Sequence, residues 1–319
     1  MSFSGSSTEA KRRTVRTLVG KLSSVLEKTR VDALCQLRLM TKQDPEIRPL
    51  IVDSGAIPYL AETLYSSTPD SQENAAATLL NISISCKEPL VSTRGVLDAI
   101  SHVLSNHRST SSPSAVQSSA ATLHSLLVID EYRPIIGSKR DIVYALVDIV
   151  KSLNSPSRSI KDALKALFGI SLYPLNRSTM IHLGAVAPLF SLVVKDGRVG
   201  IVEDSTAVIA QIAGCEESEE AFRKVSGIGV LVDLMDPVTG SSMRTKENAV
   251  SALLNLVMCG GDKLAADVRE KAERAMDGLA DVAENGSAKG KNKAVELLKV
   301  LFDDDGFGSD GHGLTDQSS

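Results

Sequence analysis

The side chains with the most regular chemistry in this sequence are amides, hydroxyls and one amine at matching positions of successive segments. An Asn or Gln amide carries a hydrogen-bond donor and an acceptor, so it can pair with a peptide main chain at two points. Such a surface can bind an extended peptide or an amphipathic helix of a partner. The candidate partner-binding residues are Asn74, Asn81, Ser125, Lys165, Gln211, Asn248 and Asn255.

The same amides have a purely structural interpretation. Asn side chains readily bond to nearby main-chain groups, so Asn81 and Asn255 could instead cap or bridge neighbouring helices. The sequence leaves both interpretations open.

Residues with catalytic or metal-binding potential show no such order. The five histidines and four cysteines are scattered singly, without metal-ligand spacing or a neighbouring nucleophile motif. Gly260-Gly261 lacks the Lys-Ser/Thr pair and preceding strand of a phosphate loop. We therefore expect no catalytic residue, no metal ligand and no cofactor, and reduced thiols in a cytosolic or nuclear protein.

The elements that position the amides are repeats. Gly55-Ala56-Ile57-Pro58-Tyr59-Leu60 returns at Gly95 to Ile100 and Gly184 to Leu189, with weaker copies at Asp141 to Leu146 and Ser226 to Leu231. The steps are 40, 46, 43 and 42 residues. This period is typical of armadillo and HEAT arrays, whose units must stack to bury their apolar faces.

One unit is clearest between residues 42 and 85. Asp44-Pro45 opens a first helix that ends before Gly55, and a second helix begins near Pro58. The segment 66–70 breaks the pattern, and a third helix covers 71–85. Three helices per unit favour armadillo over HEAT repeats.

The third helix carries a recurring stripe of one small and two large apolar residues. Because a small residue allows close helix approach, we expect the stripe to be core. Its copies are Ala33-Leu37-Met40, Ala75-Leu79-Ile82, Ser119-Leu123-Leu126, Ala163-Leu167-Ile170, Ser205-Ile209-Ile212, Ala249-Leu253-Leu256 and Ala294-Leu298-Leu301. The pattern predicts an all-α solenoid of about seven three-helix repeats, the terminal ones imperfect.

Several segments resemble the armadillo region of plant U-box proteins. They are Val52 to Leu64, Ser71 to Ser83, Lys246 to Leu256 and the closing Gly290 to Lys299. The resemblance covers residues 13 to 302 and implies a right-handed superhelix with a concave groove lined by third helices. In that family the groove binds substrates or regulators, while an N-terminal U-box docks a ubiquitin-conjugating enzyme. Only about a dozen residues precede the first repeat here, so we expect the binding half alone.

Nuclear import is a second function found among armadillo proteins. Import adaptors pair a Trp with an Asn one turn later along the groove, and the Trp contributes cation–π contacts. This sequence has no tryptophan, and aromatic residues are only 3 % of it. The import interpretation is therefore less favoured.

Charge and composition define the ends. The net charge is −4, and residues 303–319 hold five aspartates without Lys or Arg, so the array itself is nearly neutral. We expect residues 1–12 to be a flexible segment, 13–302 the solenoid, and 303–319 a disordered acidic, Gly-rich tail. A Ser-rich loop, 105–114, could be a phosphorylation segment or simply flexible.

These observations predict a non-catalytic scaffold or adaptor that binds a protein partner, a peptide or a helix, in the groove. The alternative is an accessory or substrate-recognition component of U-box-type ubiquitin ligation. The near-neutral array, the lack of a span-length apolar stretch and the lack of catalytic motifs argue against nucleic acid, membrane insertion and small-molecule substrates. We expect a cytoplasmic or nuclear location.

Overall fold

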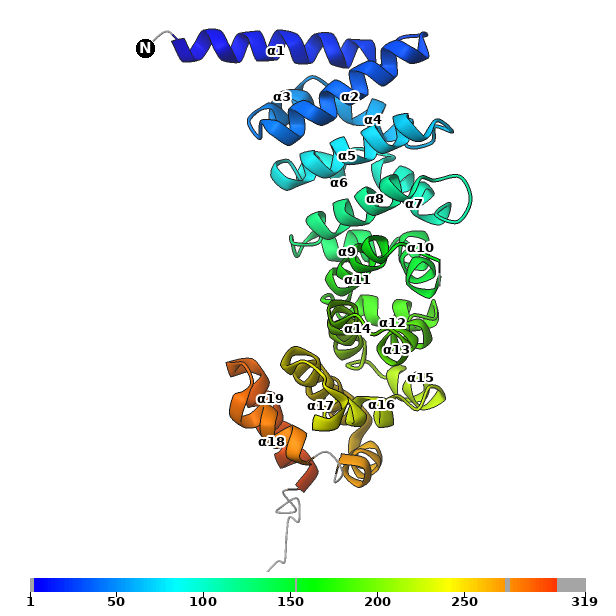
Figure 1. Cartoon of the computed structure of the whole chain (residues 1–319), viewed down its shortest axis with the longest axis vertical. Coiled ribbons are helices and arrows are strands. Elements are labelled where there is room, and N and C mark those ends of the chain that lie inside the picture. The colour runs from blue at the N-terminus through cyan, green and yellow to red at the C-terminus, as the bar shows by residue number, and fades with distance from the viewer. Residues whose placement is uncertain (1–2, 153, 273–275, 303–319) are drawn as a thin grey trace, which may run out of the picture.

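The computed structural model describes residues 3–302 except 153 and 273–275, and this described part contains helices and no strand. The helices stack into an elongated array with α1 at one end and α19 at the other (Figure 1). The helices turn progressively along the array, so α1 and α2 lie across the view while those near the middle are seen nearly end-on.

The third helices form a continuous row. Consecutive members pack on one another throughout the array. They are α2 (Glu27–Gln43), α5 (Pro69–Ser85), α8 (Pro113–Leu126), α11 (Ser157–Ser171), α14 (Val199–Ile212), the first part of α17 (Met243–Ala272) and α19 (Ala288–Phe302).

The other helices form the outer layers. The second helices are α4 (Ala56–Thr63), α7 (Val96–Ser105), α10 (Arg140–Lys151), α13 (Val186–Lys195), α16 (Gly227–Asp233) and α18 (Met276–Asn285). The first helices are α3 (Ile47–Asp53), α6 (Glu88–Ser92), α9 (Tyr132–Gly137), α12 (Leu175–His182) and α15 (Ser218–Lys224). Helix α1 (Phe3–Lys21) precedes α2, and a short 3₁₀ turn, η1 (Pro237–Thr239), precedes α17.

The recurring glycine of the sequence motif marks the turn between first and second helices. Gly55, Gly95 and Gly184 all have a positive φ, between 75° and 88°, a conformation that glycine adopts without strain. Ser226 occupies the same turn with φ 53°. The predicted unit of three helices is therefore confirmed, and the glycine ends its first helix.

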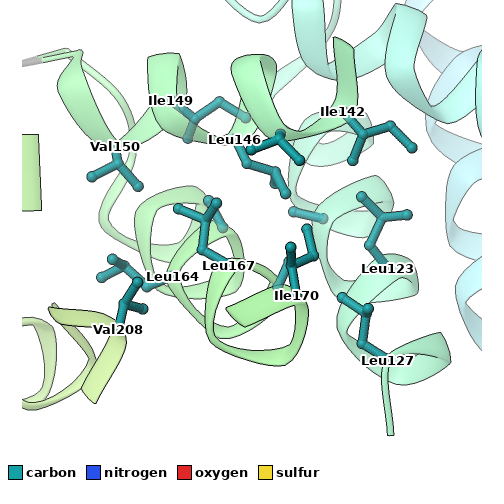
Figure 2. Close-up of a cluster of buried hydrophobic side chains, with 14 of the residues drawn as sticks. Leu123, Leu127, Ile142, Leu146, Ile149, Val150, Leu164, Leu167, Ile170 and Val208 are labelled. Atoms are coloured by element: carbon teal, nitrogen blue, oxygen red, sulfur yellow. The ribbon is translucent and has the colours of Figure 1, made fainter. Parts of the chain in front are cut away.

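The core follows the predicted stripe. Leu79, Leu123, Leu167 and Leu253 are at most 1 % exposed. Figure 2 shows how Leu123, Leu167 and their neighbours meet α10 residues such as Leu146 in a continuous apolar interior. In the last unit Ala294 and Leu301 are buried as predicted, but Leu298 is only partly buried and Leu297 takes its place in the core.

The last unit also differs in its connection. Helix α17 is kinked at Gly261, whose φ of 65° and ψ of −160° lie outside the helical region. The charged segment after the kink takes the place of a first helix and leads to α18 and α19. Gly261 thus separates the sixth third helix from the terminal unit.

The start of the chain is helical. Residues 3–12 belong to helix α1, and the expectation that residues 1–12 form a flexible segment stays a prediction. Val15, Leu18 and Val19 bury its apolar face, and Lys11 pairs with Asp44 at 2.7 Å. This part of α1 packs on α2 and α3. The predicted tail, 303–319, lies outside the described residues.

Arginines from first helices tie successive repeats together. Arg48, Arg133 and Arg177 each donate Nε–H to a carbonyl at the end of the preceding third helix. The acceptors are Thr41 O at 2.9 Å, Leu127 O at 3.2 Å and Ser171 O at 3.0 Å. Helix C-termini leave carbonyls without partners inside the helix, and these arginines satisfy them.

Candidate functional site: the third-helix groove

The candidate site is the face of the third helices that is turned away from the second helices, which we call the groove. In α5 it carries Ala77 and Asn81, one turn apart, and the equivalent residues follow in each later repeat. The packing of α5, α8, α11, α14 and α17 side by side places these residues in rows along the array.

Three of the predicted asparagines bridge repeats. The side-chain nitrogens of Asn81, Asn248 and Asn255 each donate to the preceding third helix. Asn81 donates to Arg38 O at 3.4 Å and to Thr41 Oγ1 at 3.0 Å. Asn248 donates to Glu203 O and to Thr206 Oγ1, both at 3.1 Å. Asn255 donates to Ala210 O at 2.7 Å.

These bonds fix the amide orientation. A carbonyl can only accept a hydrogen bond, so it must face the NH₂ group. The Oδ1 atoms of Asn81, Asn248 and Asn255 accept no hydrogen bond from the described residues. The side-chain nitrogen therefore bridges helices, while the oxygen keeps its capacity to accept a hydrogen bond; binding of a partner at these residues stays a prediction.

Asn74 and Gln211 have the opposite arrangement. Arg38 Nη1 donates to Asn74 Oδ1 at 3.1 Å, and Arg177 Nη2 donates to Gln211 Oε1 at 3.3 Å. Since arginine only donates, the oxygens are occupied and the NH₂ groups are left over. Asn74 is only 9 % exposed, so Gln211 is the better donor toward a partner.

The middle of the groove interrupts this amide row. Ser125 donates its hydroxyl to Ser83 O at 3.1 Å and keeps its oxygen as an acceptor. Gly169 takes the next place, where an added Cβ would lie 2.7 Å from Leu127 Cβ. Helix α11 approaches the end of α8 too closely for a side chain there. The exposed Lys165, one turn earlier, supplies the polar group of this repeat.

Two half-buried carboxylates flank Lys165. Burial raises the pKa of both Asp162 and Asp204, although Lys165 near Asp162 and Arg244 near Asp204 act in the opposite direction. Arg244 Nη2 lies 3.9 Å from Asp204 Oδ1. Burial and the charge of Lys165 lower the pKa of His124. The centre of the groove therefore holds carboxylates that their neighbours compensate only in part.

Sequence reasoning missed a row of aliphatic side chains in the groove. Ile84, Val128, Leu172 and Met258 each follow the buried leucine of their repeat by five residues. Ile84 also lies seven residues after Ala77, which is nearly two helical turns. Extending the groove pattern by one heptad would have found this row.

The groove and its surroundings show no catalytic arrangement among the described residues. No group of three or more His, Cys, Asp or Glu is placed to hold a metal ion there. Ser178 contacts His182 Nδ1 at 3.2 Å but donates to Glu217 at 2.5 Å, so its proton is directed at the carboxylate and not at the imidazole. Burial raises the pKa of the Cys215 thiol to about 12, far from a reactive thiolate.

Within the described part of the chain, no single helix has the length and apolar composition needed to cross a membrane. The helix pair Leu175–His182 and Val186–Lys195, bent by 76°, meets those criteria only when the two are taken together.

Similar solved structures agree with the architecture. An engineered protein of known crystal structure aligns with a TM-score of 0.75 and 23 % identity, covering 90 % of this chain and 68 % of that one. A designed armadillo repeat protein aligns with a TM-score of 0.51 and 19 % identity, covering 90 % of this chain and 99 % of that one. These likenesses show the fold, an armadillo-type α-solenoid.

Sequence comparison identifies the family. U-box domain-containing protein 19 of Arabidopsis thaliana is 29 % identical over 300 residues, 92 % of this chain and 43 % of the relative. U-box domain-containing protein 17 of Arabidopsis thaliana is 32 % identical over 299 residues, 92 % of this chain and 39 % of the relative. The chain thus spans about two fifths of the length of these curated relatives. The family model for the plant U-box protein ARM repeat region matches residues 14–306, and this chain belongs to that family.

Proposed function

We propose that this chain is a non-catalytic scaffold or adaptor whose third-helix groove binds a segment of a protein partner, in plant signalling. The observation that carries the proposal is the row of oriented amides. The free acceptors of Asn81, Asn248 and Asn255 and the free donor of Gln211 match the two hydrogen-bonding groups of a peptide main chain.

Orientation of the amides favours binding for a second reason. Asn81, Asn248 and Asn255 are held by hydrogen bonds to the preceding third helix, and Gln211 is held by Arg177 of α12. Little side-chain entropy is therefore lost when a partner binds. A designed armadillo repeat protein described as built for modular peptide recognition has a TM-score of 0.50 to this chain. The proposal also places the protein in the cytoplasm or nucleus, in keeping with its four free cysteines.

The test blocks the groove without breaking its helix-to-helix bonds. Ala77, Ala121 and Ala207 line the groove floor and are half-buried, so a triple change to Arg fills the floor and leaves the amides in place. We expect this variant to lose a discrete set of partners in affinity capture from plant extract, quantified by mass spectrometry.

A matched variant carries Arg at three exposed positions outside the groove. Tyr144, Val194 and Val238 lie on α10, α13 and η1 and are at least 58 % exposed. We expect this variant to keep the wild-type partners and both variants to keep the wild-type melting temperature. An unchanged partner set with the blocked floor would contradict binding in the groove.

A role in ubiquitin ligation is the second candidate, because the relatives are named as U-box domain-containing proteins. In this case the array recognises a client and a U-box ligase modifies it. A reconstituted assay with ubiquitin-activating enzyme, conjugating enzyme, a U-box protein and a captured client checks it. Client ubiquitination should require the chain and fail with the blocked floor; modification independent of the chain would exclude this role.

Nuclear import is supported least. The sequence has no tryptophan to hold Lys side chains. Titration with a basic localisation peptide checks this function, and we expect no specific saturable binding.

A further inference from the structure

A cavity outside the groove lies at the N-terminal end of the array. It is lined by the α1–α2 loop, α2, α4, the loop that follows α4 and the start of α5, and its volume is about 610 Å³. The two loops lie on the same side of the array in Figure 1. Leu22 and Leu34 line its base and are at most 6 % exposed. The cavity thus belongs to the first two units and is separate from the face of the third helices that carries the amides.

Two tyrosines line this cavity. Tyr59 on α4 and Tyr65 in the loop after it are 39 % and 50 % exposed. The whole chain has five tyrosines and no tryptophan, so two exposed rings at one cavity are a concentration of its aromatic surface. The Tyr65 ring packs on the His102 ring of α7, with 4.7 Å between the centroids, and this contact holds it in place. Rigid aromatic side chains give a large contact area at a low cost in entropy, as binding surfaces require.

The polar groups that remain free in the cavity are mainly hydrogen-bond donors. Arg30 donates from Nη1 to Ser24 O at 2.7 Å and to Val25 O at 3.2 Å, and it forms no ion pair with a described residue. Its Nε and Nη2 and the two tyrosine hydroxyls make no hydrogen bond within the described part of the chain. The Ser71 hydroxyl likewise has no partner among these residues, although Ser71 is only 6 % exposed. A ligand must therefore bring acceptors.

Two carboxylates at the same cavity disfavour an anionic ligand. Glu27 and Glu62 line it together with Arg30. Glu27 Oε1 accepts from Thr68 Oγ1 at 2.7 Å, and this bond closes the loop after α4 onto α2. With two carboxylates for one guanidinium, the cavity repels an acidic segment. Its free donors thus suit neutral acceptors such as main-chain carbonyls.

A polyproline II segment has the matching chemistry. Proline has no main-chain N–H, and the polyproline II helix makes no internal hydrogen bonds, so its carbonyls need donors and it needs no acceptor from the site. Such segments dock in aromatic-lined grooves, and their preset conformation loses little entropy on binding. An α-helix uses its own carbonyls internally. An extended segment with N–H groups would need acceptors beside the tyrosines.

We propose that this cavity binds a proline-rich partner segment in the polyproline II conformation. Its proline rings pack on Tyr59 and Tyr65, and its main-chain carbonyls accept from Arg30 and from the tyrosine hydroxyls. The surface lies outside the third-helix groove, so the inference goes beyond the proposed function and does not depend on it.

Fluorescein-labelled peptides test the chemistry by anisotropy at physiological salt. One contains ten prolines, one alternates Gly and Ser over ten residues, one alternates Pro and Glu over ten residues, and one is an alanine-rich helix former of twenty residues. We expect the ten-proline peptide to bind at least tenfold tighter than the other three. Equal or tighter binding of any of those three would overturn the proposal.

Variants locate the contact. Tyr59→Ser with Tyr65→Ser should weaken binding of the ten-proline peptide at least tenfold. Tyr59→Phe with Tyr65→Phe should weaken it at least threefold, because the rings remain but the two donors are lost. Tyr144→Ser changes an exposed tyrosine on α10 and should alter binding less than twofold. Circular dichroism checks that each variant keeps the wild-type melting temperature.

The triple Arg variant that blocks the groove floor separates the two surfaces. It should bind the ten-proline peptide as the wild type does, whether or not it loses partners in affinity capture. Unchanged binding in either double variant of Tyr59 and Tyr65, or loss of binding with the blocked groove floor, would overturn the proposal and leave the test of the groove unaffected.

Discussion

Hydrogen-bond accounting at single residues separates what holds the array together from what remains for a partner. Asn255 donates from its side-chain nitrogen to Ala210 O, and Gln211 accepts at its side-chain oxygen from Arg177. Each amide has two hydrogen-bonding ends, so a structural bond at one end leaves the other available. One amide side chain can therefore bond to a neighbouring helix at one end and still offer a hydrogen-bonding group at the other.

The two central carboxylates make a prediction about pH. Folding raises the pKa of Asp162 and Asp204 above the ordinary 3.8, because burial disfavours the ionised form. Their contribution to stability is favourable while they are protonated and is lost as the pH rises through the raised pKa. Asp162→Asn with Asp204→Asn should therefore increase stability at pH 7, and the increase should shrink toward pH 4.

Urea unfolding of wild type and variant between pH 4 and 8 measures this difference. Asp141→Asn, at an exposed carboxylate on α10, serves as the control for replacing a carboxylate on the surface. A double variant less stable than wild type at pH 7 would mean that attraction to Lys165 and Arg244 outweighs burial.

At the scale of the helices, hydrogen bonds at the C-terminal ends of third helices link successive repeats. Three third helices, α2, α8 and α11, end where an arginine of the next first helix donates to a carbonyl: the arginines are Arg48, Arg133 and Arg177. Each bond joins two consecutive units at the end of a third helix.

Arg48 is the most testable of these bonds because it is buried, at 7 % exposed. It donates to Thr41 O and, through Nη1, to Ser85 Oγ at 2.9 Å. Arg48→Met keeps most of the apolar stem but leaves the carbonyl without its charged donor, which should cost about 1.5–3 kcal/mol. Thermal unfolding of wild type, Arg48→Met and the exposed control Arg94→Met measures this cost. If Arg48→Met melts at the wild-type temperature, water has replaced the arginine as the donor to the carbonyl.

Over the whole molecule, each unit touches only its neighbours, so stability is a sum of units and interfaces. The row of third helices in Figure 1 follows this plan, with α5 packed between α2 and α8. A defect in one unit should therefore spread to adjacent units before it reaches the ends.

Leu79→Asp tests this spread. Leu79 lies in α5 and is 1 % exposed. An aspartate there would lose the packing of the leucine and place a carboxylate in the core. We expect this change to lower the free energy of unfolding by about 3–5 kcal/mol, as truncations of core residues do. Hydrogen exchange should show lost protection in α2, α5 and α8, while α17 and α19 keep theirs. Protection lost evenly along the chain would instead show that the array unfolds as one unit.

Local pattern predicted the architecture well. The period of the glycine motif and the small-large stripe from Ala75 to Ile82 gave the three-helix unit, since helix turns and core contacts recur with a fixed spacing along the chain. Two details were not predicted: residues 3–12 are helical, and Leu297 takes the buried place predicted for Leu298. Both lie in terminal units, where packing on one neighbour replaces the two-sided packing that sets the pattern.

The sequence by itself determined the repeat and most of the core stripe, because these depend on spacing within one helix. Only the tertiary structure decided which end of each amide is free, since Asn81 and Asn248 bond to helices more than forty residues away. The tertiary structure also decided that α11 lies so close to the end of α8 that a side chain at Gly169 would collide with Leu127. Contacts between repeats depend on the distance and angle of helix packing, which no spacing within one segment specifies.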